Sequence, residues 1–136
     1  MGRVVNVGQG DIAPSTVVWI PTLEMVVAGD VAYNSNHLML GLSGPEEWKR
    51  WIESVNTLRA LKPKTAIAGH KKPEVSDEAE AILDGTEAYL RNFAQVAASS
   101  TTAEEIVSKM RHRYPNYGNV TVLVMSAEAF VNRPSA

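Results

Sequence analysis

The sequence has no cysteine among its 136 residues. This absence excludes a disulfide framework, a cysteine nucleophile and a cysteine-ligated zinc site, so a bound metal ion would have to be held by His, Asp or Glu. An excess of charge is also absent, since 13 Lys and Arg stand against 15 Asp and Glu. Without a strong positive field to attract phosphate groups, we expect neither nucleic acid nor a membrane surface as a partner.

Long hydrophobic runs are missing as well. The N-terminal residues 1–6 contain no apolar signal core, and the apolar run Met25–Ala28 is far too short to cross a membrane. We therefore expect a cytoplasmic protein. Apolar residues make up 45% and charged residues 21%, which is typical of a globular domain. This length is sufficient for one core and short for two, so we expect a single domain over residues 1–136.

Four short segments have the composition of β-strands and are bounded by Gly, Pro or Asp. They are residues 3–7, 16–20, 25–28 and 65–68. The stretch Gly8–Asp11 between the first two predicts a hairpin turn, because no Lys or Ser follows it at the spacing of a phosphate loop. After Gly29-Asp30 we expect irregular structure.

Capping signals and apolar periodicity predict helices that begin near Pro45, near Ser76 and after Thr102. Residues 120–130 are ambiguous, because their composition suits a strand while their apolar spacing also suits a helix; we favour the helix. The strand at 25–28, the first helix and the strand at 65–68 together predict a crossover unit with two parallel strands.

Two short motifs, Gly29-Asp30 and Gly69-His70, each follow a predicted strand. Parallel strands of a right-handed crossover end at the same edge of a sheet, so Asp30 and His70 are expected close together. A carboxylate oxygen and an imidazole nitrogen are both suitable ligands for zinc. The structural alternative is that Gly-Asp is a turn and Gly-His belongs to a solvated loop.

Other candidate sites have less support. The serine residues lack the sequence context of an activated nucleophile. The basic segment Arg111-His112-Arg113 could contact phosphate, but it lies at the end of a predicted helix, where cations offset the helix dipole. We favour the interpretation that this segment is a solvated helix end.

Three segments, Val26–His37, Trp51–Pro63 and Ala68–Pro73, together resemble the second half of the metallo-β-lactamase superfamily of hydrolases in order and spacing. The resemblance extends over about residues 15–130. It implies an α/β fold, namely the C-terminal half of an αββα sandwich, with one mixed sheet covered by helices on one face. In that superfamily the Gly-Asp aspartate bridges two metal ions and the Gly-His histidine is the last ligand, which implies Asp30 and His70 as metal ligands.

The resemblance lacks most of the superfamily's metal ligands. The H-x-H-x-D-H motif and a further histidine are absent, and the three histidines are His37, His70 and His112. A catalytic zinc ion normally takes three protein ligands, so Asp30 and His70 alone are expected to hold zinc weakly or not at all. His37 is a third ligand, a residue near the site mouth, or an ordinary solvated or hydrogen-bonded loop residue.

Two functions follow from this. We favour a half-domain that has lost hydrolase activity and acts as a self-associating binding or assembly module, because a lone half exposes an apolar sheet face that a homodimer would cover. The alternative is a metal-dependent hydrolase, acting on an ester, thioester or lactam, whose site is completed by another chain. A small-molecule ligand is compatible with both, and the sequence names no substrate.

Overall fold

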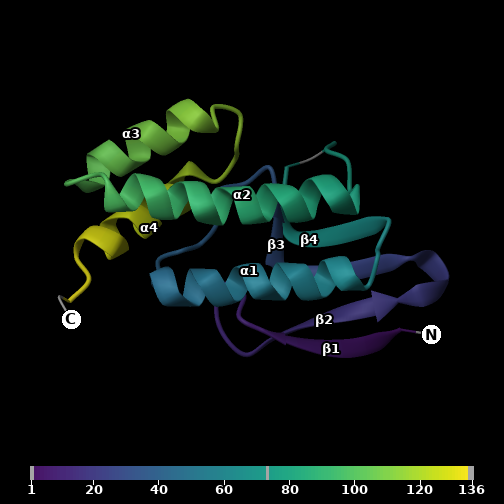
Figure 1. Cartoon of the computed structure of the whole chain (residues 1–136). Coiled ribbons are helices and arrows are strands. Elements are labelled where there is room, and N and C mark those ends of the chain that lie inside the picture. The colour runs from purple at the N-terminus through teal and green to yellow at the C-terminus, as the bar shows by residue number, and fades with distance from the viewer. Residues whose placement is uncertain (1, 73, 135–136) are drawn as a thin grey trace.

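The computed structural model describes residues 2–72 and 74–134, which form a mixed four-stranded sheet and four α-helices (Figure 1). The predicted α/β architecture is therefore confirmed. The strands are β1 (Arg3–Gly8), β2 (Ser15–Ile20), β3 (Met25–Asn34) and β4 (Thr65–Lys71), with a short 3-10 turn η1 (Pro21–Leu23) between β2 and β3. The helices are α1 (Pro45–Ala60), α2 (Ala79–Ala98), α3 (Ala103–Arg113) and α4 (Val120–Val131).

The strands lie in the order β1-β2-β3-β4. β1 pairs with β2 and β2 with β3 in antiparallel fashion, whereas β3 and β4 are parallel. The hairpin predicted at Gly8–Asp11 joins β1 to β2, and α1 makes the predicted crossover between β3 and β4. Among the helices in the described residues, none combines the length and apolar character needed to span a membrane.

One face of the sheet, here called the closed face, is covered by α1 and α2 (Figure 1). Alternate strand residues point into this layer and are buried, as the period of two in a strand requires. They include Val17, Trp19, Val26, Ala28 and Ala66. The helices meet them with large apolar side chains at spacings of three and four, among them Trp48, Trp51, Val55 and Leu58 of α1. This layer is the main hydrophobic core.

The C-terminal part of the chain is helical. The Thr102 side chain accepts a hydrogen bond from the Glu105 backbone nitrogen at 3.1 Å, which confirms the predicted start of α3. Residues 120–130, ambiguous in sequence, lie in α4. Figure 1 shows α3 alongside α2, with α4 beneath them at the end of the molecule. The favoured helical interpretation of residues 120–130 is therefore confirmed.

The prediction of irregular structure after Gly29-Asp30 is wrong, because β3 continues to Asn34. The strand contains a bulge: four residue steps of β3, from Gly29 to Tyr33, lie opposite two steps of β4, from Ala68 to His70. The extra residues interrupt the period of two, so the pattern of a strand is lost locally in the sequence. Pairing resumes at Tyr33, which lies opposite His70. β4 is thus also longer than predicted and ends at Lys71.

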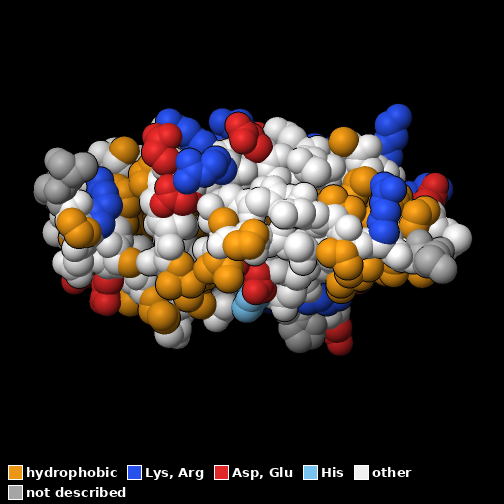
Figure 2. All heavy atoms as spheres, turned by 90° about the horizontal axis from the view of Figure 1, so that it is seen from below, with side chains coloured by type: hydrophobic (Ala, Val, Ile, Leu, Met, Phe, Trp, Pro, Cys, Tyr) orange, Lys and Arg blue, Asp and Glu red, His pale blue; other side chains and the backbone are white. Residues whose placement is uncertain are grey.

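The other face of the sheet, here called the open face, also carries apolar side chains. The strand register places Val4, Val18, Val27 and Ile67 in one row across all four strands. Val4 is 70% exposed and Val27 is 37% exposed. Figure 2 shows that hydrophobic side chains gather in several groups on the surface seen from below. Strands that are apolar on both faces are typical of sheets that are buried on both faces.

Candidate functional site

Asp30 and His70 come together as the sequence predicts. Nε2 of His70 lies 3.1 Å from Oδ1 of Asp30, and the two side chains are 42% and 51% exposed, respectively. Their position differs from the prediction in one respect: they lie at the bulge between β3 and β4, not after the ends of these strands. Both side chains are thus accessible to solvent. Their backbones belong to β3 and β4, which are hydrogen-bonded neighbours in the sheet.

The glycines that precede the pair have separate roles. Gly29 has a φ of 53°, a left-handed conformation that side chains disfavour and that the bulge requires. Gly69 leaves space for Asp30, since a Cβ atom at Gly69 would lie 2.8 Å from Oδ1 of Asp30 and 3.0 Å from the Gly29 backbone. The Gly-Asp and Gly-His motifs are therefore explained by the close approach of two backbones.

Tyr33 forms the inner wall of this site. Its ring stacks on His70, with centroids 4.8 Å apart and an interplanar angle of 10°. The ring is buried, and its hydroxyl oxygen is a buried polar atom with no hydrogen-bond partner among residues 2–72 and 74–134. Burial, followed by the negative charges of Asp11 and Asp30, raises the pKa of the Tyr33 hydroxyl, which therefore remains neutral at physiological pH.

Asp11 acts on this site through its charge, which the sequence did not predict. Burial and the nearby charge of Asp30 raise the pKa of the Asp11 carboxyl, while His70 opposes the shift. The loop backbone also approaches β3, since a Cβ at Gly10 would lie 3.4 Å from the backbone oxygen of Asp30. The turn composition of Gly8–Asp11 predicts the hairpin but contains no signal that the loop approaches β3 or that the charge of Asp11 acts on this site.

His37 does not join the pair. It has no exposed surface, and its Nδ1 lies 2.8 Å from the Tyr89 hydroxyl oxygen. Its ring also makes edge contacts with Tyr89 and Tyr117, at centroid distances of 5.7 Å. The expectation of a third ligand or site-mouth residue is thus corrected: His37 is a hydrogen-bonded core residue, because the segment after β3 turns inward beneath α2. Burial and the charge of Arg111 lower the pKa of His37 to about 4.

The residues of the site do not by themselves fit a zinc centre. Within residues 2–72 and 74–134, no set of three His, Asp or Glu side chains is close enough together to hold a metal ion. Asp11 raises the pKa of Tyr33 through its charge. Such an electrostatic effect acts over a longer range than a bond between a ligand and a metal ion, so it does not make Asp11 a metal ligand. A zinc site needs about three protein ligands, and Asp30 with His70 supplies one oxygen and one nitrogen.

Comparison with solved structures identifies the fold. A metallo-β-lactamase from Pontibacter korlensis matches 67% of this chain with a TM-score of 0.51 and 21% sequence identity. The metallo-β-lactamase DIM-1 matches 67% at a TM-score of 0.52 and 24% identity, and VMB-1 matches 69% with the same TM-score and identity. The chain spans 41% to 42% of the length of these proteins.

Neither a search of protein-family models nor a search of curated proteins found a match to this sequence. At this level of sequence identity, the structural likeness shows the fold alone. Because the match covers less than half of each larger protein, this chain has part of the metallo-β-lactamase fold. The resemblance drawn from the segments around Asp30 and His70 is confirmed at the level of architecture.

Proposed function

Because the chain has part of the metallo-β-lactamase fold, we propose that it acts as a self-associating assembly module whose open sheet face packs against the same face of a second copy. The observation that carries this proposal is the apolar row Val4, Val18, Val27 and Ile67, which crosses all four strands. Burying each such side chain contributes up to about 1.5–3 kcal/mol, so a face of this kind favours removal from water.

The chemistry of the open face supports a symmetric partner. The register adds a second row, Ile20, Met25 and Thr65, next to the first. Neither row contains a charged residue, so these rows can stack without repulsion between like charges. A two-fold axis makes the same patch meet itself, which requires a surface that is complementary to itself, and an apolar sheet face meets that condition.

The size of the face sets a further requirement. Four strands spaced ~4.8 Å apart, each at least six residues long, cover an area of ~400 Å² per copy. A persistent interface buries about 1,000 Å² or more in total. The contact must therefore extend to the ends of the strands, where Ile12 and Leu23 are 54% and 60% exposed, respectively.

A pair of matched substitutions tests the proposal. Val27 on the open face and Val131 on α4 are similarly exposed, at 37% and 39%. We expect sedimentation velocity at micromolar concentration to show a dimer for the unmodified chain and for Val131→Glu, and a monomer for Val27→Glu, because a carboxylate in the interface would be buried without a partner. A monomeric unmodified chain, or a dimeric Val27→Glu variant, would refute the proposal.

A second candidate function is a metal-dependent hydrolase of esters, thioesters or lactams whose site is completed by another chain. The observation in its favour is the exposed Asp30–His70 pair, with Gly69 leaving the room that the pair needs. In this case the missing ligands come from the partner, since the residues described here supply two.

Metal content separates the two functions. If another chain completes the site, zinc should be retained stoichiometrically after gel filtration of the assembled complex, and both Asp30→Ala and His70→Ala should abolish retention. If the chain is an assembly module only, the dimer should persist in a chelator and in both variants. Retention of zinc by the double variant would exclude the Asp30–His70 pair as a metal site.

A further inference from the structure

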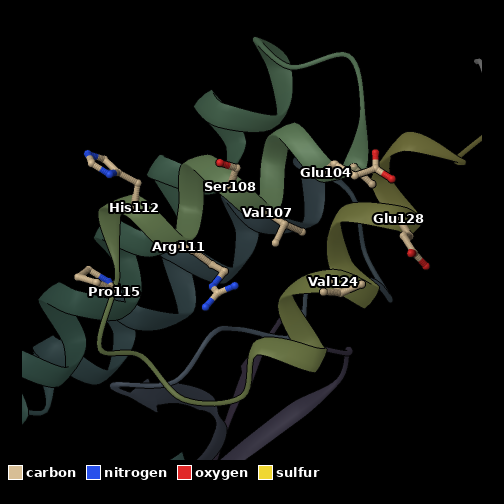
Figure 3. A pocket seen from close by; sticks show the side chains of 9 residues that line it. Glu104, Val107, Ser108, Arg111, His112, Pro115, Val124 and Glu128 are labelled. Atoms are coloured by element: carbon tan, nitrogen blue, oxygen red, sulfur yellow. The ribbon is translucent and has the colours of Figure 1, made fainter.

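A groove with a volume of about 910 Å³ lies between α3 and α4, away from the Asp30–His70 pair (Figure 3). This size is within the range of small-molecule and short-peptide sites. Its two walls are aliphatic and come from different helices: Val107 of α3 faces Val124 of α4 (Figure 3). The groove is therefore apolar along its middle.

The two ends of the groove carry opposite charges. Arg111 points into the space between the helices at one end, and Glu104 and Glu128 lie at the other end, one from each helix (Figure 3). In the part of the chain that the structure describes, none of these three side chains takes part in an ion pair. On another face of α3, by contrast, Lys109 pairs with Glu105 at 2.9 Å.

The basic segment at the end of α3 is thus not a uniform solvated helix end. Arg113 donates a hydrogen bond to the Asn92 side-chain oxygen at 2.7 Å, whereas Arg111 and His112 both line the groove. Arg111 points into the space between the helices (Figure 3), and its charge lowers the pKa of the buried His37. A single guanidinium at an apolar groove suits one carboxylate better than a phosphate backbone.

The distance between the charges selects the length of a ligand. Glu104 and Arg111 are seven residues apart on one helix, which separates them by ~10 Å along the axis. An extended peptide of three residues has the same length, at about 3.3–3.6 Å per residue. Its terminal ammonium and carboxylate groups would match the acidic and basic ends, while apolar side chains would contact the walls.

We propose that the groove between α3 and α4 binds short apolar peptides with free termini, of about three residues. The carboxylate of the peptide pairs with Arg111, and its ammonium group lies between Glu104 and Glu128. Val107 and Val124 enclose its side chains. The two carboxylates exceed the charge of the single guanidinium, so a peptide with a free N-terminus is favoured over one with a blocked N-terminus.

Calorimetric titration of the full chain with the tripeptide Ala-Val-Ala tests this site. We expect saturable binding, and a dissociation constant at least about tenfold higher for Arg111→Met and for Glu128→Gln, since each removes a charge-assisted contact. Acetylation of the peptide's N-terminus or amidation of its C-terminus should each have a similar effect. Dipeptides should bind less tightly, because they cannot reach both ends.

Matched control variants remove charge from the same helix outside the groove. Lys109→Met and Glu105→Gln disrupt the pair on the other face of α3 and should leave the dissociation constant unchanged. Arg111 and Glu128 are exposed, so their substitution is not expected to affect folding, which circular dichroism would verify. The proposal is overturned by absence of binding at millimolar peptide, by equal affinity for doubly blocked peptide, or by equal affinity of Arg111→Met.

Discussion

The closed and open faces of the sheet have similar composition and different surroundings. Val26 and Val27 are neighbours in β3, yet Val26 has no exposed surface beneath the helices, whereas Val27 is 37% exposed on the other side. The alternation of a strand sends one to each face. An apolar residue pattern thus specifies which surfaces favour burial, while the helices available decide which of these surfaces are buried within the chain.

Removal of a helix side chain from the closed face should have the largest effect. Trp51 of α1 has no exposed surface, and its indole nitrogen donates a hydrogen bond to the Val31 backbone oxygen at 2.7 Å. We expect Trp51→Ala to lower the free energy of unfolding by about 4 kcal/mol, through a cavity and a lost hydrogen bond. Chemical denaturation measures this change. A loss below about 1 kcal/mol would mean that α1 is not anchored to the bulge.

Acid should lower the free energy of unfolding through protonation of the buried His37. Its pKa is about 4 in the folded chain and about 6.5 when unfolded, so the unfolded state binds the proton more tightly. The stability contributed by neutral His37 is therefore fully present above pH 6.5 and is lost as the pH falls toward 4. The difference between these pKa values corresponds to about 3 kcal/mol.

Comparison with a variant isolates this effect from other titrating groups. The free energy of unfolding of the unmodified chain minus that of His37→Gln should decrease by about 3 kcal/mol between pH 7 and pH 4. Denaturant titrations of both proteins at each pH give this difference. A difference that is independent of pH would show that His37 titrates normally in the folded chain.

The neighbouring valines of β3 test the two faces directly. Val26→Ala should lower the free energy of unfolding by about 2 kcal/mol, because the cavity forms in the core. Val27→Ala should change it by less than about 0.5 kcal/mol in dilute protein, where the open face meets water. If the open face is an interface, the cost of Val27→Ala should rise with protein concentration. Equal costs at all concentrations would contradict the distinction between the faces.

Substitution at the bulge between β3 and β4 should cost less stability than the substitutions of the core residues Trp51 and Val26. Gly69→Ala would bring a methyl group within 3.0 Å of the Gly29 backbone and force the Asp30 side chain to move. We expect a loss of about 1 kcal/mol in stability and a displaced Asp30, detectable as a change in the His70 imidazole resonances in NMR spectra. Gly44→Ala is a suitable control, since a Cβ there would only contact the Glu47 carboxylate, at 3.6 Å. Unchanged His70 resonances would contradict the proposed role of Gly69.

Local signals in the sequence were sufficient for most elements. Thr102 with Glu105 marks the start of α3, and the spacing of the apolar residues in α1 predicts the stripe that covers the sheet. The proximity of Asp30 and His70 also followed from strand order, because a right-handed crossover makes their strands parallel neighbours. These features depend on residues that are close in sequence or on one general rule of topology.

Contacts between distant segments were not predictable in this way. The bulge in β3 depends on pairing with β4, which lies about 40 residues later, and the approach of Asp11 depends on where the hairpin loop packs. The residues around His37 have no apolar periodicity and therefore predict a loop. In the structure, Tyr89 and Tyr117 from later segments pack against the His37 ring. The pattern of neighbouring residues in the sequence does not indicate such distant contacts.

Most elements, their order, the apolar character of both sheet faces and the residues Asp30 and His70 could be predicted from the sequence, because each depends on side-chain chemistry and spacing along the chain. The packing of distant segments was needed to show which face the helices cover, that the Asp30–His70 pair lies at a bulge, that His37 is buried, and that Arg111 lies at the opposite end of an apolar groove from Glu104 and Glu128. These outcomes depend on packing between segments far apart in the chain, where volume and hydrogen bonding must be satisfied at the same time.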